Sequence, residues 1–172
     1  MRHARIATFA PLALLAASTA HADPAAMPLR PLCTADLPAR CQPLADVPAS
    51  STTPGPQFAA RISVANCVAM ESMSKLDLKP DALSIHTLDT AAQQSLALLD
   101  EVILKGDAHY REVARAARAD LLNGMVVRIR TVANDPKDKN GIEHRLALWN
   151  KAAESTIAMG PSCPAPEQRI AS

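Results

Sequence analysis

The nine residues LDEVILKGD, from Leu99 to Asp107, contain the end of one helix and the start of the next. Apolar side chains recur at steps of three and four up to Lys105, and Gly106 then supplies the residue that most often ends a helix in the left-handed conformation. Asp107 follows directly as an N-cap. Because so short a connection leaves the two helices adjacent, the stretch predicts an antiparallel helical hairpin.

Upstream of this joint, apolar residues at helical spacing predict two helices. The one that ends at Lys105 is expected to begin after an N-cap at Thr87, and an earlier one is expected over residues 56–76, with Pro80 blocking its continuation. The inward-facing residues expected in these two helices are Phe58, Ile62, Ala65, Ala69, Met73 and Leu76, followed by Leu88, Ala92, Leu96, Leu99, Val102 and Ile103.

Downstream of the joint, two more helices are expected. The helix capped by Asp107 is stopped by Asn134–Pro136, and the last helix begins at an Asn140 cap, with Glu143 in the capping-box position, and is stopped by Gly160–Pro161. The inward-facing residues expected there are Tyr110, Val113, Ala117, Leu121 and Gly124, followed by Ile142, Leu146, Trp149, Ala153 and Ile157. Short connections and the absence of alternating strand patterns predict an all-α, up-and-down bundle of about four helices.

The first 22 residues have the organisation of a secretory signal peptide. Arg2 and Arg5 precede an apolar run over residues 6–17, and Ala20–Ala22 supplies small residues at the two positions that a signal peptidase recognises. The run is shorter than the roughly 20 apolar residues that cross a bilayer. We therefore expect cleavage after Ala22, no transmembrane segment afterwards, and a periplasmic or secreted protein; the Ala-rich, Arg-rich composition favours a bacterial one.

A proline-rich segment separates the signal peptide from the predicted helices. Residues 23–56 carry eight prolines, which remove backbone hydrogen-bond donors and disfavour regular helix. The segment is therefore predicted to be an extended arm or linker. The helical bundle domain is then expected over residues 57–163, and residues 164–172 are expected to form a C-terminal tail.

All four cysteines lie in the part of the chain expected to be exported. An even number in an oxidising compartment predicts two disulfides that staple the domain. The pairing favoured by spacing joins Cys33 to Cys41 as a local clip, and Cys67 to Cys163 as a long-range link. Pairing of the N-terminal cysteines with those of the helices is the alternative. Because there is no CxxC pair and no close Cys/His cluster, neither a metal site nor a cofactor is expected.

The balance of positive and negative residues limits the classes of partner that the protein is expected to bind. Removing the signal peptide leaves sixteen Lys and Arg against seventeen Asp and Glu, and this balance argues against a nucleic-acid binder. Within it, Arg111, Arg115 and Arg118 lie at steps of four and three on one helix face, and arginine suits bidentate contact with carboxylate or phosphate. They are a candidate surface for an acidic protein or envelope polymer; the alternative is an ordinary solvated helix face.

The sequence contains none of the common catalytic motifs: no Gly-rich phosphate loop, GxSxG, HExxH or CxxCH. Weaker metal-binding patterns are present at His86 with Asp89, at His109 with Glu112, and at Cys67 with Met70 and Met73. Surface pairs, a disulfide cysteine and core methionines explain them more simply.

Together these features predict an exported, non-enzymatic interaction or binding module of the bacterial cell envelope or secretome, with no catalytic residue. A carrier that holds a small ligand or metal in the bundle interior is the first alternative. An enzyme with an unrecognised site is the second. No pattern in the sequence identifies the oligomeric state.

Overall fold

The structure, a computed structural model, describes residues 29–46, 54–133 and 139–158. Its elements in chain order are the 3-10 helices η2 (Thr34–Asp36) and η3 (Gln42–Ala45) and the α-helices α1 (Gly55–Leu78), α2 (Ala82–Lys105), α3 (Ala108–Ala133) and α4 (Lys139–Ala158). No strand occurs in the described residues. The all-α class predicted from the sequence is therefore confirmed for this part of the chain.

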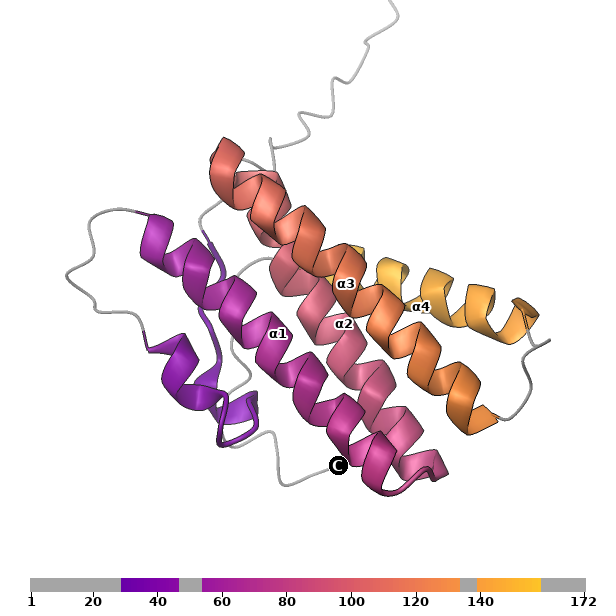
Figure 1. The fold of residues 1–172 in the computed structure, drawn as a ribbon. Helices are drawn as coiled ribbons and strands as arrows, with labels where there is room; N and C mark the ends of the chain where they lie inside the picture. The colour runs from indigo at the N-terminus through magenta and orange to yellow at the C-terminus, as the bar shows by residue number, and fades with distance from the viewer. Residues whose placement is uncertain (1–28, 47–53, 134–138, 159–172) are drawn as a thin grey trace, which may run out of the picture.

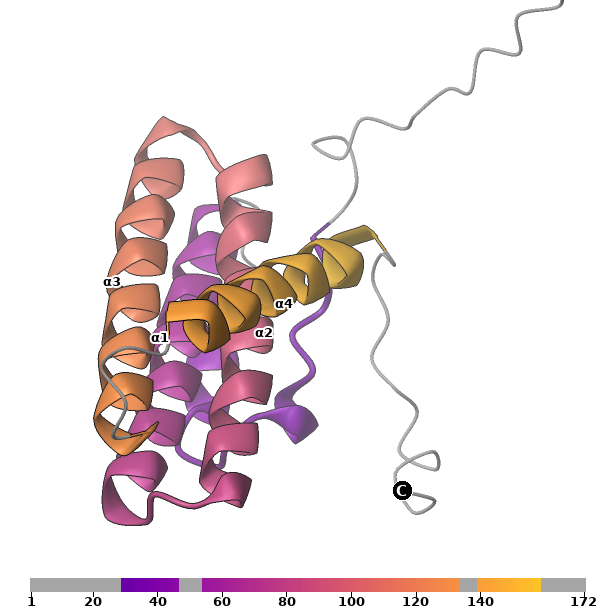
Figure 2. The same ribbon diagram turned by 90° about the vertical axis from the view of Figure 1, so that its right-hand side faces the viewer.

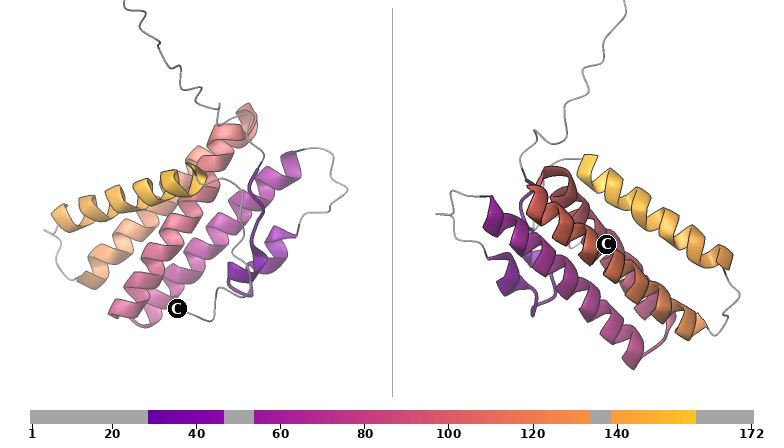
Figure 3. Two further views of the ribbon diagram at one scale, coloured as in Figure 1. Left: turned by 180° about the vertical axis from the view of Figure 1, so that it is seen from behind. Right: turned by 45° about the horizontal axis from the view of Figure 1, so that its top comes forward.

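The helices are arranged around α2. Helices α1, α2 and α3 lie side by side, each antiparallel to the one before it (Figure 1). Helix α4 also packs against α2, but it crosses α2 obliquely (Figure 2; Figure 3, left). The up-and-down arrangement is consequently not confirmed for the four helices as a set, because α4 lies across the three-helix layer.

The core is formed where these helices meet. Leu88, Leu96 and Leu99 of α2 are fully buried, and Trp149 and Ala153 of α4 cover the side of α2 that α4 crosses. The inward-facing residues expected in α1 are buried, with Met73 partly so. The sequence pattern therefore identifies the buried faces of α1, α2 and α4 correctly.

Helix α3 buries part of the face expected, with Leu121 buried and Tyr110 and Ala117 packed against the core, but it departs from the expectation at Val113. Val113 is 40% exposed, whereas its neighbour Ala114 is fully buried, together with Met125 further along the helix. The buried stripe thus lies one residue later than predicted at these positions. Because α3 is rich in alanine and has a glycine at Gly124, two neighbouring stripes of similar apolar character are present, and the sequence pattern does not separate them.

The start of α2 also differs from the expectation. Its N-cap is Asp81, whose carboxylate accepts a hydrogen bond from the Ser84 backbone N–H at 2.8 Å. This hydrogen bond is the main cause that lowers the pKa of Asp81 to about 2. Thr87, the predicted cap, lies inside the helix and donates its hydroxyl to the Leu83 carbonyl oxygen. The N-cap prediction at Thr87 is wrong, because an aspartate directly after Pro80 already supplies a strong cap.

The joint between α2 and α3 is confirmed in its capping but corrected at its glycine. Asp107 caps α3 by accepting a hydrogen bond from the Tyr110 N–H at 3.0 Å. Gly106, however, has φ −70° and ψ 159°, an extended conformation rather than the left-handed one expected. Glycine is needed there for space, since a Cβ atom would lie 2.6 Å from the Val102 carbonyl oxygen and 3.3 Å from Tyr110 Cβ.

The last helix begins at Lys139, so Asn140 lies within its first turn instead of preceding it. The difference is within the one or two residues by which helix ends are ordinarily uncertain. The predicted stops at 134–136 and 160–161 and the signal peptide, residues 1–22, lie outside the described residues.

The described part of the proline-rich segment packs on the helices. Residues 29–46 lie beside α1 in both views of Figure 3, and Cys41 and Ala45 are buried against Val64, Val68 and Ala91 of α1 and α2. The prediction of an extended arm or linker is therefore not confirmed for these residues. None of the helices in the described ranges has the length and apolar character that a bilayer crossing requires.

We predict that Gly106→Ala destabilises the protein by roughly 1–3 kcal/mol, because the added methyl group contacts backbone that has no room to move. The matched control is Gly124→Ala in α3, where the nearest atom to a new Cβ is Met73 Sδ at an ordinary 3.4 Å. Alanine at Gly124 should stabilise or leave unchanged the melting temperature, since alanine favours helix over glycine. Equal melting temperatures for Gly106→Ala and wild type would contradict the packing argument.

Candidate functional site

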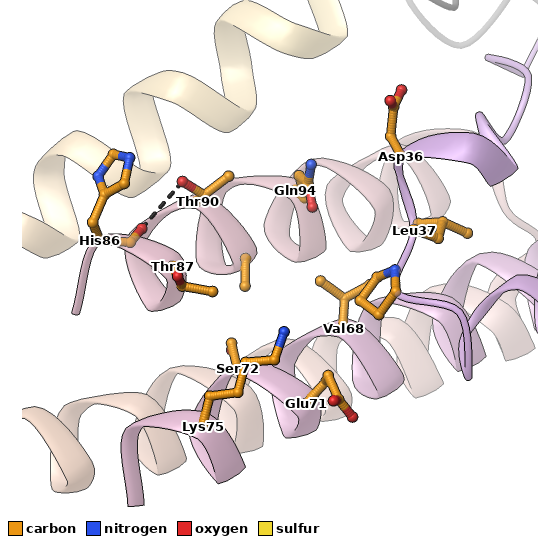
Figure 4. Close-up of a pocket in the computed structure, with 12 residues that line it drawn as sticks. Asp36, Leu37, Val68, Glu71, Ser72, Lys75, His86, Thr87, Thr90 and Gln94 are labelled. Atoms are coloured by element: carbon orange, nitrogen blue, oxygen red, sulfur yellow. Dashed lines mark hydrogen bonds between the residues drawn. The ribbon is translucent and has the colours of Figure 1, made fainter. Parts of the chain in front are cut away.

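A groove lies between the N-terminal segment and the hairpin of α1 and α2. Its cavity volume is about 420 Å³, and residues 36–38 form its wall at one end. In Figure 4, α1 and α2 face each other across it, with Leu37 at the far end. Leu37, Val68 and Ala91 supply its apolar lining, and its polar lining residues are Asp36, Glu71, Ser72, Lys75, His86, Thr87, Thr90 and Gln94.

Two other cavities of similar size are less suited to a specific site. One, of about 410 Å³, is lined in part by Cys67. It is bounded by Leu44, which is 42% exposed, and by Met70, which is 67% exposed. The other, of about 420 Å³, lies between α3 and α4 and is lined mainly by apolar residues such as Leu122 and Ile142. The groove at residues 36–38 differs from both because three separate segments contribute polar groups to it.

A disulfide holds the wall of the groove in place. Cys41, at the start of η3, is bonded to Cys67 in the middle of α1, with a Cα–Cα distance of 5.7 Å. This corrects the favoured pairing of Cys33 with Cys41 and of Cys67 with Cys163, and it agrees with the alternative in which N-terminal cysteines pair with the helices. Cys33 is also disulfide-bonded, and its partner lies outside the described residues.

A buried carboxylate gives the wall a second attachment. Glu101 of α2 is 0% exposed, and its Oε1 accepts hydrogen bonds from the Arg30 backbone N–H at 2.8 Å and from Lys105 Nζ at 2.9 Å. Its Oε2 lies 3.3 Å from Arg61 Nε of α1. The Arg61 guanidinium also donates to the Arg30 carbonyl oxygen, and Arg30 donates to the Thr156 carbonyl oxygen of α4. Glu101 therefore ties together the N-terminal segment, α1 and α2.

The charge state of this cluster follows from its contacts. Burial acts to raise the pKa of Glu101, but the hydrogen bonds from Arg30 and Lys105 and the charge of Arg61 together hold that pKa below its ordinary value. Burial lowers the pKa of Arg61, and Glu101 opposes this effect. Glu101 is thus an ionised carboxylate near neutral pH, which is the form that the surrounding cations stabilise.

The polar groups of the groove are unequally engaged. The hydroxyls of Thr87 and Thr90 each donate to a backbone carbonyl one turn earlier, as the dashed line from Thr90 shows in Figure 4. Glu71 is paired with Arg40 at 2.9 Å. Lys75, by contrast, makes no ion pair with a carboxylate that the structure describes. Among its polar groups, the groove therefore presents acceptor oxygens on α2, the ammonium of Lys75 and the carboxylate of Glu71 on α1, and the carboxylate of Asp36 on η2.

The three arginines predicted to form a contact surface do not act together. Arg111 is exposed and Arg115 has a side chain that is 57% exposed, so both lie on the outer face of α3. Arg118 instead pairs with Asp100 of α2 at 2.6 Å and donates to Asn150 of α4. The expectation that all three are solvated is corrected for Arg118, which connects three helices.

Asp89, which the sequence placed in a weak metal-binding pattern with His86, has a structural role. Its carboxylate accepts hydrogen bonds from the Trp149 Nε1–H at 2.9 Å and from the Arg145 guanidinium. The imidazole of His86 points away from α1 in Figure 4. Asp89 therefore fastens α4 onto α2, and its oxygens are already occupied.

Side chains of the other two metal patterns take part in other contacts. Cys67 is in the disulfide, which removes its thiolate from the set with Met70 and Met73. His109 contacts the edge of Tyr110, with 5.2 Å between ring centroids. Across the described residues, no group of three or more His, Cys, Asp and Glu side chains is close enough together to hold a metal ion.

In comparisons with known proteins, no family model, no curated protein and no solved structure matches the chain. The support for the candidate site therefore comes from its own residues.

The most informative residues of the site, Glu101 and Arg61, were not identified from the sequence pattern. Glu101 lies between Leu99 and Val102 on the apolar stripe of α2, and Arg61 adjoins Ile62 on that of α1. A charge at such a position signals a buried pair, because an unpaired buried charge is strongly unfavourable.

We predict two disulfides in the oxidised protein: Cys41–Cys67, and a bond between Cys33 and Cys163. Cys163 lies outside the described residues, but it is the one cysteine of the four that the first bond leaves for Cys33. Peptide mapping without reduction checks both bonds, and thiol titration of the unfolded chain should find almost no free thiol. A peptide that joins Cys33 to Cys41 would contradict the prediction.

We predict that Glu101→Gln destabilises the protein by roughly 3 kcal/mol or more, because it leaves buried cations without their counter-charge. The pKa of Glu101 is lowered on folding, so its contribution is present above the unfolded value of 4.5 and is lost as the pH falls through the lower folded value. Denaturant unfolding at several pH values should show this acid-dependent component in wild type and not in the variant. Glu112→Gln, on a 79%-exposed side chain, is the control and should behave like wild type.

Proposed function

We propose that this chain is an exported, non-enzymatic binding module that holds its ligand in the groove between residues 36–38 and the α1–α2 hairpin. The observation that carries the proposal is that the N-terminal segment is attached on both sides of residues 36–38, at Arg30 through Glu101 and at Cys41 through Cys67. A wall fixed in this way gives a preformed groove, which binds without a large ordering cost.

Export is supported by two independent features. The residues at the N-terminus have the order of a signal peptide. The disulfide chemistry at Cys41, Cys67 and Cys33 belongs to an oxidising compartment such as the periplasm or the extracellular space. We infer that the mature chain begins at Asp23 and acts in the bacterial cell envelope or outside the cell.

Binding is favoured over catalysis by the state of the groove's hydroxyls. Thr87 and Thr90 direct their protons to the backbone of α2, not to a base that would activate them as nucleophiles. The cysteines nearest to the groove are in disulfides. These groups are arranged to contact a ligand rather than to attack one.

The outer face of α3 offers a second contact region. Arg111 and Arg115 remain candidates for contact with an acidic protein or envelope polymer, whereas Arg118 is paired with Asp100 of α2. In our proposal this face is secondary to the groove.

To test whether the groove binds a ligand, the full chain is expressed in a bacterial host with a photo-reactive amino acid at one position at a time. Cross-linked products are expected at Thr90 and Gln94, which line the groove, and not at Glu112 on the outer face of α3. The purified protein should begin at Asp23 by intact mass. Products only at Glu112 would assign binding to the arginine face instead, and an exported protein that still carries Met1 would refute the cleavage.

A further inference from the structure

We propose that the groove binds a short peptide segment carrying a carboxylate, with that carboxylate against Lys75. This inference rests on the proposed function and specifies its ligand. The lining contains a cationic donor on one helix and oxygen acceptors on the other, and a peptide supplies the complement of both.

The hydroxyls on α2 can accept hydrogen bonds from a ligand but have no proton left to donate. Thr87 Oγ1 donates to the Leu83 carbonyl at 2.9 Å, and Thr90 Oγ1 donates to the His86 carbonyl at 3.1 Å. A hydroxyl has one proton and two lone pairs, so each oxygen keeps acceptor capacity. A ligand with several N–H donors along its length satisfies them, and a peptide backbone has one such donor at nearly every residue.

The groove is lined by one ammonium, that of Lys75, and by two carboxylates, those of Asp36 and Glu71. Lys75 extends from α1 towards α2 in Figure 4 and is unpaired with any described carboxylate. Glu71 Oε2 lies 2.9 Å from the exposed Arg40 guanidinium, and Asp36 also has an interaction partner, so both carboxylates are engaged while the Lys75 ammonium has no such partner among the described residues. A single ammonium is a point charge that can pair with one carboxylate, and no described arginine lines the groove for bidentate contact.

Size and surface exclude larger or flatter ligands. A volume of about 420 Å³ lies in the range of small-ligand pockets and is too small for a folded partner. Leu37, Val68 and Ala91 give an aliphatic lining, and no described Phe, Tyr or Trp side chain lines the groove as a stacking platform for a sugar or base. A few residues of extended chain with small side chains fit these conditions.

The experiment titrates ¹⁵N-labelled, oxidised protein with two probes, N-acetyl-Ala-Ala-Glu-amide and N-acetyl-Ala-Ala-Gln-amide, and follows the amide signals. We expect saturable shifts confined to residues 71–75 and 86–94. The Glu probe should bind about two- to fivefold more tightly than the Gln probe, the size of an exposed ion pair. Lys75→Gln should abolish that difference, and the control Lys151→Gln, on the exposed side of α4, should keep it.

Other results of the titration would contradict either the peptide inference or the proposed function. Equal affinity of the two probes in wild type overturns the carboxylate contact. If neither peptide shifts the groove but maltotriose does, the peptide inference fails while the proposed binding function stands. If none of these probes shifts the groove and photo-cross-linking at Thr90 and Gln94 also gives no product, the proposed function itself fails.

Discussion

Glu101 sets the constraint on which the rest of the structure depends. A fully buried carboxylate costs several kcal/mol of desolvation unless cations and hydrogen bonds surround it. Here the compensating groups come from the N-terminal segment, from α1 and from the last turn of α2, through Arg30, Arg61 and Lys105. The helical hairpin therefore buries its own charge favourably only when residues near Arg30 are docked on it. For this reason the proline-rich segment around Arg30 is packed on the helices and can form one wall of the groove.

A similar arrangement fixes α4. Asp89 of α2 accepts hydrogen bonds from Trp149 and Arg145, while Asp100 receives Arg118 from α3. Helix α2 thus presents carboxylates to the segments packed around it, and each is paired. Directional polar contacts of this kind add to the steric packing of the side chains in determining how the helices fit together. The oblique position of α4 is consistent with such contacts.

Much of the fold could be predicted from local sequence rules, and the limits of those rules are visible in particular residues. The helices of the hairpin follow from apolar spacing, and Asp107 follows from capping chemistry, because both depend on neighbours in the chain. The partner of Cys41, the crossing of α4 and the groove depend on segments far apart in sequence. Arg30 is 71 residues from Glu101, for example, and no periodicity relates them. In the site, Lys75 and Thr90 have no distinguishing local pattern, since ordinary surface helices contain both; only the docked residues 36–38 make them neighbours of a groove.

The Cys41–Cys67 bond has a consequence for how the molecule is made. A chain that leaves the ribosome or a translocation pore begins with its N-terminus, so Cys33 and Cys41 are exposed to oxidants before Cys67 arrives. A bond between these two early cysteines, only eight positions apart, would be the first one accessible, yet it is absent from the native protein. Maturation therefore requires either that oxidation waits until α1 has emerged or that an early bond is exchanged through a mixed disulfide. The yield of correctly folded protein therefore depends on the timing of thiol oxidation, and any early bond between Cys33 and Cys41 must be exchanged before the native bond can form.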